Sequence, residues 1–414
     1  MTRTFEVDCC IVGGGPAGMM AGLLFARAGC KTLVLEKHSD FLRDFRGDTV
    51  HPSTLEIMQE LGLLEEFLKR PHQPLSHLAG IFGGERVEMI DFSLIDATCK
   101  FVALMPQWHF LDFISGAAKS LPDFSVEMNA HVTSLIEENG RVVGVHSETA
   151  DGPMEVRAKL VIGADGRGST VRDCAGFKVK DIGAPIDVLW FRVPRDLDED
   201  EELLLNAGAG NFVVTIDRGD YYQCAFVIPK GGADAVKKQP LDAFRKAVIS
   251  TVPFLRGKMD ALTDFDDVKL LTVTIDRLER WSRPGLLMIG DSAHAMSPVG
   301  GVGINLAIQD AVAAANLLAG PLADGTLKDD DLEKVRKRRL MPVRVTQFMQ
   351  GQAQNHILKP ALAKGNVKPR PPLPLRLMSK LTWLKRRASA FVGLGLRQEH
   401  VCSPERHKPT SPKN

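Results

Sequence analysis

The sequence has little net charge, and its cysteines show none of the spacings that bind metals or build disulfide frameworks. Over 414 residues, 52 lysines and arginines stand against 51 aspartates and glutamates, a formal charge of +1. The seven cysteines are scattered and include no C-x-x-C pair. Such a set argues against a disulfide-stapled secreted domain and is typical of a reducing cytosol. We therefore expect a cytoplasmic protein that binds no metal and no nucleic acid.

We also expect residues 9–26 to be neither a membrane span nor a signal peptide. Residues 9–26 carry no charge, which is close to the minimum length for a transmembrane helix. The Gly-Gly-Gly-Pro run at 13–16 would break such a helix, however, and Glu6 and Asp8 stand where a signal peptide has positive charge. We interpret this segment as a strand, a turn and a helix.

What the sequence does have is the composition of a large globular protein. Apolar residues make up 44% and charged residues 25%, and the length allows two or three domains. The charge is unevenly spread. Residues 355–414 carry thirteen lysines and arginines against two acids, or +11, which leaves −10 for the rest of the chain. The C-terminal part therefore differs in character from the body.

The chain before residue 355 contains two kinds of secondary-structure pattern. Residues 5–12 form an apolar run of strand length, 16–28 predict a helix, and 31–35 predict a second strand, which together make a βαβ unit of a parallel sheet. Residues 186–274 instead contain alternating, β-rich runs that predict an antiparallel sheet and a second domain. Helices follow around 329–355, and we find no internal repeat.

The turn of the βαβ unit carries a phosphate-binding pattern. Gly13, Gly15 and Gly18 fit G-x-G-x-x-G between a strand and a helix, and Glu36 ends the next strand. The glycines allow a tight turn and close approach of a pyrophosphate, while the carboxylate can accept from ribose hydroxyls. The pattern predicts dinucleotide binding but leaves FAD and NAD open.

Two further segments each follow a predicted buried strand. Residues 163–172 read GADGRGSTVR, and residues 290–305 read GDSAHAMSPVGGVGIN. With the glycine loop, their order and spacing over residues 5–315 resemble the single-component (class A) FAD-dependent aromatic hydroxylases, flavoprotein monooxygenases with the p-hydroxybenzoate hydroxylase fold.

The resemblance implies an α/β fold in three parts. A Rossmann-like FAD-binding domain with a parallel sheet is expected from residues 1–75, 100–185 and 275–320. An inserted, mainly antiparallel substrate-binding sheet is expected from 76–99 and 186–274. The remainder, 321–414, is expected to be a C-terminal helical and basic tail region.

The resemblance also assigns residues to FAD. Arg46 matches an arginine that contacts the flavin's phosphate region, and Gln107 resembles the glutamine that holds the ribityl chain. Asp165 belongs to a segment associated with FAD and pyridine nucleotide, Asp291 matches the aspartate on the ribityl hydroxyls, and Pro298 the proline beside the ring. The other expected FAD-binding residues are Gly13, Gly15, Pro16, Ala17, Gly18, Glu36, Lys37, Gly290, Gly301, Val302, Gly303, Ile304 and Asn305.

Physical reasoning agrees with part of this assignment. The run Val-Gly-Gly-Val-Gly at 299–303 lets backbone approach a flat ligand. A helix beginning at about Ile304 can stabilise negative charge on the flavin. Pro298 and His294 are the catalytic candidates, although His294 fits a structural or flavin-neighbouring role better than proton transfer. Asp165 has a similar alternative, because a carboxylate after a strand often caps a turn.

The activity implied is oxygenation of an aromatic or heteroaromatic small molecule. NADH or NADPH would reduce FAD, O2 would add at flavin C4a, and the hydroperoxide would transfer one oxygen to the ring. The chain has just two tyrosines, so the tyrosine relay known in the family cannot be assigned. Residues proposed for the substrate by location alone are Trp190, Arg192, Phe212, Tyr222 and Gln223.

Other functions stay open at this point. An isoprenoid-quinone hydroxylase, an epoxidase or a prenyl reductase would keep the fold and act on a lipid. A flavin halogenase is disfavoured because no W-x-W-x-I-P occurs. A non-enzymatic flavin-fold protein is the third alternative, and formation of a homodimer is open.

The basic tail has two interpretations. Leucines and Trp383 alternate with lysines and arginines between residues 376 and 387, as in peripheral contact with a membrane. The alternative, which we favour, is that the tail packs on the acidic body or on a second subunit.

Overall fold

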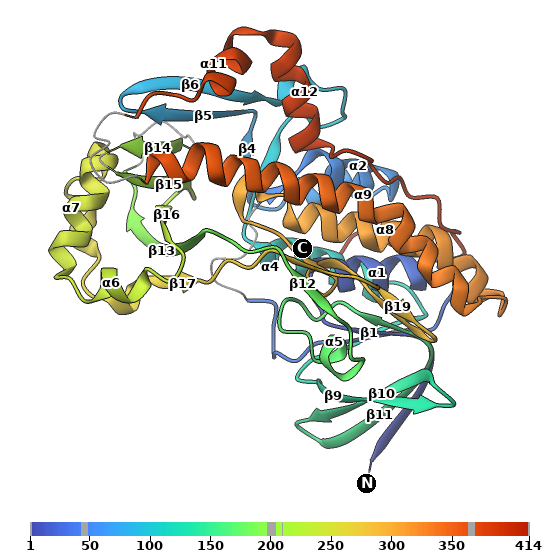
Figure 1. The fold of residues 1–414 in the computed structure, drawn as a ribbon. Helices are drawn as coiled ribbons and strands as arrows, with labels where there is room; N and C mark the ends of the chain where they lie inside the picture. Colours follow the sequence, from blue (N-terminus) through green and yellow to red (C-terminus); the bar gives the residue numbers. More distant parts are fainter. Residues whose placement is uncertain (1, 43–48, 197–203, 209, 363–368, 413–414) are drawn as a thin grey trace.

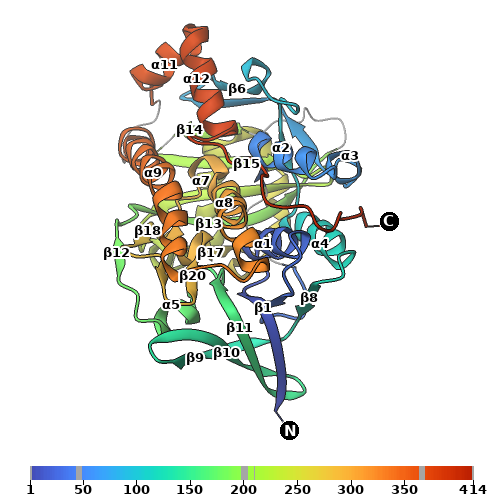
Figure 2. The same ribbon diagram turned by 90° about the vertical axis from the view of Figure 1, so that its right-hand side faces the viewer.

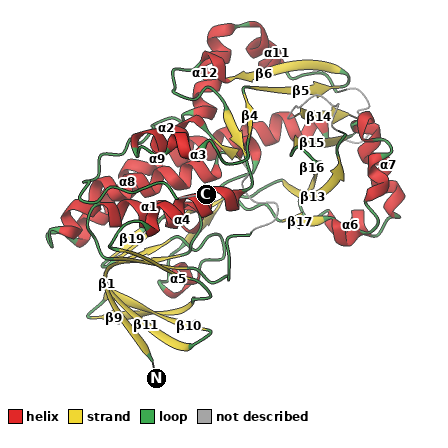
Figure 3. Cartoon of the chain, turned by 180° about the vertical axis from the view of Figure 1, so that it is seen from behind, coloured by secondary structure: helices red, strands yellow, loops and turns green. Residues whose placement is uncertain are grey.

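The computed structural model describes residues 2–42, 49–196, 204–208, 210–362 and 369–412, and it confirms the mixed α/β class. A sheet of mainly parallel strands lies at the N-terminal end of the molecule, and a second sheet lies beside it (Figure 1). The C-terminal helices α11 (Leu373–Lys380) and α12 (Thr382–Gly393) lie at the opposite end from the N-terminus (Figures 1 and 3). Arg46 falls outside the described residues.

The first sheet is built around β1, which is fully buried over its last residues because Cys9–Val12 are apolar. Its parallel strands, in spatial order, are β20 (Leu286–Met288), β11 (Gly152–Gly163), β1 (Arg3–Val12), β2 (Thr32–Leu35) and β8 (Phe124–Glu127). The edge strand β19 (Ser282–Arg283) pairs antiparallel with β20. The predicted parallel βαβ unit is therefore confirmed.

A hairpin extends this sheet toward the N-terminal end of the molecule. Strands β9 (His131–Glu138) and β10 (Arg141–Thr149) are antiparallel and joined by Asn139 and Gly140, with φ of 49° and 77°. Two consecutive positive φ angles are what a tight two-residue hairpin turn requires, and Asn-Gly supplies them at low cost.

Helices α1 (Pro16–Arg27), α4 (Gln107–Lys119) and α8 (Gly303–Ala323) pack together against this sheet. Among the described residues, Val299–Ala323 is the segment long and apolar enough to cross a membrane. Yet 72% of its apolar 18-residue stretch is buried inside the protein. That burial is typical of a core helix. Short helices α2 (Pro52–Glu60), α3 (Leu64–Phe67) and α5 (Thr170–Cys174) complete this part.

The second sheet has seven strands and is antiparallel except where β14 meets β5. Its order is β17 (Lys269–Leu271), β13 (Ile186–Pro194), β16 (Tyr221–Pro229), β15 (Asn211–Asp217), β14 (Leu204–Gly208), β5 (His77–Phe82) and β6 (Glu85–Asp91). Helices α6 (Ala233–Lys237) and α7 (Leu241–Thr251) lie on one face (Figure 1). Strands β5 and β6 therefore share a sheet with the strands between Ile186 and Leu271, while the domain boundaries remain a prediction.

Small strands and turns join the two sheets. Strands β3 (Thr49–Val50), β4 (Gln73–Leu75) and β7 (Val102–Leu104) form one three-stranded sheet. Strands β12 (Val179–Asp181), β18 (Asp276–Leu278) and β21 (His294–Ala295) form another.

The C-terminal part crosses the whole molecule. Helix α9 (Asp329–Ala353) packs on α8, and α11 (Leu373–Lys380) and α12 (Thr382–Gly393) pack on β6. The last described residues return along α1 and α4 (Figure 2). There the Arg27 carbonyl accepts from Arg406 N at 2.9 Å, and Arg27 pairs with Glu405 at 2.7 Å. This is the packing on the body that the sequence analysis favoured.

Candidate functional site

The glycine loop between β1 and α1 has one open position and two closed ones. A Cβ on Gly13, where φ is +106°, would lie 2.4 Å from the Ala164 carbonyl oxygen, and one on Gly18 would lie 1.9 Å from that of Gly13. A Cβ on Gly15 meets nothing within 4 Å. Gly15 is also the N-cap of α1, and no side chain caps that end. The loop therefore offers open space in front of free helix amides, which fits the pyrophosphate of a dinucleotide.

Glu36 at the end of β2 is buried and closes the loop from the side. Its carboxylate accepts from Gly14 N at 2.8 Å and from His38 N at 3.0 Å, and His38 Nδ1 lies 2.5 Å away. These contacts hold Glu36 beside the glycine turn, where the predicted ribose contact would occur. Lys37 is exposed. The sequence analysis did not single out His38.

Asp165 lies at the end of β11 and caps a turn. It accepts from Ser169 Oγ at 2.5 Å and from Val171 N at 3.1 Å at the start of α5. Burial raises its pKa, although these hydrogen bonds act in the opposite direction. The turn-capping alternative is therefore the arrangement that the structure contains, and a contact with FAD or pyridine nucleotide stays a prediction.

Arg167 connects the two later motifs. Its Nε donates to Asp291 Oδ2 at 3.1 Å, and both side chains are about one-third exposed. Asp291 therefore lies at an accessible surface beside a cation, as expected for a residue that meets a polar ligand. No sequence pattern indicated Arg167, because the pair is separated by 124 residues.

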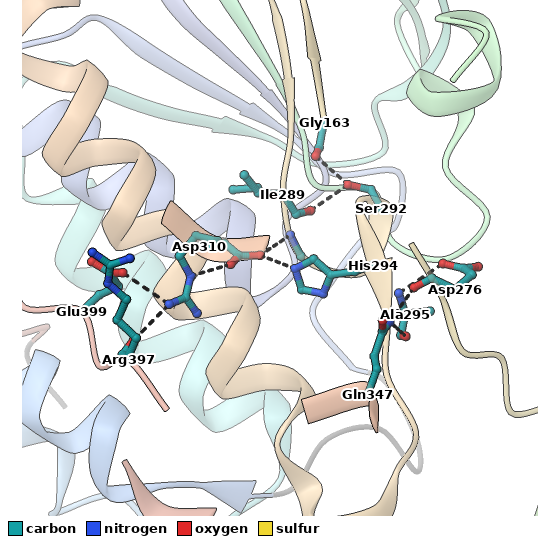
Figure 4. Close-up of polar contacts among 12 residues, drawn as sticks. Gly163, Asp276, Ile289, Ser292, His294, Ala295, Asp310, Gln347, Arg397 and Glu399 are labelled. Carbon is teal, nitrogen blue, oxygen red and sulfur yellow. Dashed lines mark hydrogen bonds and ion pairs between the residues drawn. The ribbon is translucent and has the colours of Figure 1, made fainter. Parts of the chain in front are cut away.

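His294 is enclosed behind the Gly290 turn. Its Nε2 lies 2.6 Å from Asp310 Oδ2 (Figure 4). Its ring centre lies 5.0 Å from that of Trp281. Gly290 N donates to the same Asp310 oxygen at 3.1 Å. With 1% of the side chain exposed, His294 fits the structural role that the sequence analysis preferred.

Asp310 carries a charge inside the core. Burial disfavours its ionised form, but His294 and Arg339 outweigh burial and hold the pKa of Asp310 below its ordinary value. Arg339 Nε donates to Asp310 Oδ1 at 2.9 Å. The sequence analysis missed both residues.

The turn that leads into α8 is backed by a neighbouring strand. Gly300 and Gly301 have φ of +81° and +63°, and the Gly301 carbonyl accepts from Thr49 Oγ1 at 2.8 Å. The turn residues Pro298, Val302 and Gly303 and the following Ile304 are half-buried. Helix α8 begins at Gly303 without a side-chain cap, so its first amides can meet a ligand.

Asn305 and Gln107 are the remaining predicted cofactor residues. Asn305 Oδ1 accepts from His51 N at 3.0 Å and from Thr54 Oγ1 at 2.7 Å. It therefore ties α8 to α2 by protein contacts. Gln107 is buried at the first position of α4.

The substrate candidates divide between the two faces of the second sheet. Register places Trp190 opposite Ala225, Arg192 opposite Gln223 and Phe212 opposite Val227, so Trp190, Arg192, Phe212 and Gln223 share one face. Tyr222 points to the other face, where its ring centre lies 5.4 Å from that of Phe254. We therefore correct the expectation for Tyr222 and remove it from the substrate set.

The face with Trp190 and Phe212 belongs to the same apolar cluster as Val299 of the glycine-rich turn. The C-terminal segment contributes Leu358 and Leu375 to this cluster. This contribution was not predictable from the sequence, in which the segment lies beyond the last flavin motif.

Comparison with known proteins identifies similar FAD-binding proteins and monooxygenases. The family model described as "FAD binding domain" matches residues 6–349. The 6-methylpretetramide 4-monooxygenase of Streptomyces rimosus is 33% identical over 336 residues, which cover 81% of this chain and 80% of that protein. The rifampicin monooxygenase of Streptomyces venezuelae is 29% identical over 73% of this chain, and the aligned region spans 62% of its own length.

A solved structure shows the same fold. PqsL, a probable FAD-dependent monooxygenase from Pseudomonas aeruginosa, superposes with a TM-score of 0.73 at 21% identity. The match covers 86% of this chain and 98% of that one.

Proposed function

Because this chain belongs to the FAD binding domain family and is an FAD-dependent aromatic monooxygenase, we propose that its substrate binds between the 298–303 turn and the sheet face that carries Trp190. The observation that supports this position is the apolar cluster shared by Trp190, Phe212 and Val299. For the substrate we propose a ring compound of the kind named in the 33% identical relative, 6-methylpretetramide. The comparisons support this aromatic reading over the lipid alternatives.

Bound FAD supplies the redox chemistry, which takes electrons from NADH or NADPH and activates O2 for transfer of one oxygen atom to the ring. The open space at Gly15 and the amides of α1 would bind the pyrophosphate. Asp291, oriented by Arg167, would hold ribityl hydroxyls. The N-terminal amides of α8 would stabilise negative charge on the ring system.

The second sheet would exclude water and orient the substrate. Its apolar residues surround the reacting ring and limit the side reaction that releases H2O2. Arg192 and Gln223, adjacent on the same face, would bind the polar substituents of the substrate. We propose that the other residues predicted from the sequence to contact FAD do so in the roles that the sequence analysis gave them.

The test is a panel of aromatic acids, phenols, pyridines and quinones, with 6-methylpretetramide and p-nitrophenol included. NADH and NADPH oxidation, H2O2 release and product mass are measured for each compound. We expect substrate-stimulated oxidation with an added oxygen in the product. Oxidation that no aromatic compound stimulates would contradict the proposal.

Substitutions on the two faces of the sheet test the position. Trp190→Ala should raise KM and the fraction of NAD(P)H lost as H2O2, because it opens the apolar face. Tyr222→Phe alters the opposite face of the same sheet and serves as the matched control. Equal effects of both substitutions would contradict the proposed position.

We also propose that α11 and α12 contact an anionic lipid surface. Leu373 and Trp383 are 66% and 60% exposed, and Leu377 and Leu381 are exposed nearby. No acidic residue occurs between 355 and 398, so two copies of this face would repel each other whereas anionic lipid would attract it.

Vesicle co-sedimentation tests this contact. The protein should pellet with phosphatidylserine-containing vesicles and not with phosphatidylcholine alone, and Trp383→Ala should weaken pelleting. Phe348→Ala, an exposed aromatic on α9, is the control. Equal behaviour with both kinds of vesicle would exclude the contact. Homodimer formation stays a prediction that light scattering can check.

A further inference from the structure

A row of buried charged side chains connects the Gly290 turn to the end of the chain (Figure 4). Asp310 lies on α8, Arg339 on α9 and Glu399 in the last segment, and their side chains are 0%, 0% and 3% exposed. Charges at this depth persist in proteins only where each is paired and hydrogen-bonded. Each member therefore depends on the next one in the row.

Asp310 holds both sides of the motif that carries Asp291. One of its oxygens accepts from Gly290 N at 3.1 Å, just before Asp291, and lies 2.6 Å from His294 Nε2, just after it. The other oxygen accepts from Arg339 Nε at 2.9 Å. The position of Asp310 therefore determines the geometry of the turn from which Asp291 projects.

Arg339 is in turn held by the C-terminal segment. One of its terminal nitrogens donates to the Arg397 carbonyl at 3.1 Å and lies 3.3 Å from Glu399 Oε1. Arg338 Nε donates to the same Glu399 oxygen at 2.8 Å. Without Glu399, Arg339 would have only Asp310 as an acidic partner among the described residues. Its guanidinium would then shift and displace Asp310, or water would enter to solvate the charge.

We propose that Arg339 and Glu399 are positioning residues for the FAD site. Docking of residues 397–399 fixes Arg339, which fixes Asp310 and thereby the Gly290–Asp291 turn in the geometry that binds FAD. The inference rests on the assignment of this turn to FAD. Because coupling between two binding events is reciprocal, FAD must tighten the docking of the tail by the same factor as the docked tail tightens FAD.

The first experiment measures the affinity of the full-length apoprotein for FAD. Glu399→Gln should weaken FAD binding by roughly tenfold, within the usual range of coupling between sites. Arg406→Gln is the matched control, because Arg406 lies in the same tail but pairs with Asp324 on the surface. Its affinity for FAD should equal that of the unaltered chain.

The second experiment measures the effect of FAD on the docking of the tail. FAD should slow proteolytic cleavage of residues 400–412 in the unaltered chain, and this protection should be lost in Glu399→Gln. A purely structural role for the tail would lower the melting temperature of apo and FAD-bound protein equally and leave FAD affinity unchanged. That outcome would overturn the inference.

A milder variant covers the case in which Glu399→Gln does not fold. Arg338 is 37% exposed and contacts Glu399 from the outer side, so Arg338→Gln loosens Glu399 without leaving a fully buried charge alone. It should weaken FAD binding by about twofold or more. An unaltered chain that binds no FAD would refute the site assignment itself, whereas equal FAD binding by all variants would refute the coupling alone.

Discussion

At the scale of single residues, Gly15 and Gly18 belong to one motif but meet different surroundings. A side chain at Gly15 would project into open space in front of α1, and the backbone there has φ of −74°, which any residue adopts. We predict that Gly15→Ala leaves the free energy of unfolding of the apoprotein within ~0.5 kcal/mol of the unaltered value. FAD affinity should fall at least about tenfold, ~1.4 kcal/mol.

Gly18→Ala supplies the contrast. Its Cβ would lie 1.9 Å from the Gly13 carbonyl, so the helix must move away from the strand and the apoprotein itself should lose stability. Urea unfolding with and without FAD separates the two substitutions. A Gly15→Ala apoprotein as unstable as Gly18→Ala would show that Gly15 serves packing rather than a ligand.

His51 makes stability depend on pH. Burial lowers its pKa from 6.5 to about 4, and the hydrogen bond between its Nδ1 and the Val392 carbonyl opposes that shift in part. Between these values the unfolded chain binds a proton that the folded chain excludes. Stability should therefore fall as the pH drops from about 6.5 to about 4, by ~3 kcal/mol from this residue.

Urea unfolding across this pH range, with His51→Asn as the comparison, isolates the contribution. The asparagine amide can still donate to the Val392 carbonyl but does not titrate. The difference in unfolding free energy between the two proteins should change steadily from pH 6.5 to 4. A difference that is independent of pH would mean that His51 charges equally in both states.

The conformation of the glycine turn was predictable from the sequence because it is local, whereas contacts that depend on a distant partner were not. Gly13, Gly15 and Gly18 are readable because the turn they build spans six residues. Arg167 and Glu399 are not, because their partners lie 124 and 60 residues away and only packing brings them together. The roles proposed for Gln107 and Arg46 stay predictions.

At the scale of elements, Asn305 connects α8 to the start of α2 by hydrogen bonds. It is the acceptor for His51 N and Thr54 Oγ1, both in a buried setting at the start of α2. Asn305→Ala leaves these donors without an acceptor and should reduce the free energy of unfolding by ~2 kcal/mol. Urea unfolding measures the loss.

Asn316→Ala is the matched control for Asn305→Ala. Asn316 lies on the same helix, and its hydrogen bonds to His400 O and Cys402 N are exposed to water. The same change should cost ~0.5 kcal/mol there. Equal losses in the free energy of unfolding at both positions would show that the contact between α8 and α2 stabilises the fold no more than an exposed hydrogen bond does.

Element types were more predictable than the directions of side chains. The apolar run at 5–12 and the Asn-Gly turn at 139–140 depend on local physics, and the structure contains both. The alternation over 186–274 predicted strands but left the facing of Tyr222 open, because facing is fixed by pairing with β13 and by the cover of α7. Nothing in the sequence indicated that Leu358, Ala361 and Leu375 would join the apolar cluster of the second sheet.

At the scale of the whole molecule, the uneven charge of the sequence has a structural counterpart. The basic tail lies along the acidic body, where Arg406 pairs with Asp324 and His407 with Asp123. These exposed pairs contribute little each and weaken with salt. The buried contacts of Arg397 and Glu399, and those of Arg27 with Ser403, should therefore dominate the attachment.

Two truncations isolate the contribution of residues 397–400. A chain ending at residue 400 loses the surface pairs of the tail and the Ser403 and Glu405 partners of the buried Arg27, and a chain ending at 396 also loses the partners of Arg339. The shorter chain should be less stable than the longer one by ~3 kcal/mol, because it leaves a buried cation short of partners. Equal urea midpoints for the two chains would contradict this.

The pairing of Arg27 with Glu405 joins helix α1 to a residue 378 positions further along the chain. During synthesis, α1 is therefore made long before its partner emerges. Strand β20 and helix α8 are likewise made after the second sheet, although they complete the first sheet and its cover. Nascent chains must therefore keep an unfinished first sheet from aggregating until these later elements have emerged. We expect premature termination late in the gene to yield insoluble fragments rather than a smaller enzyme.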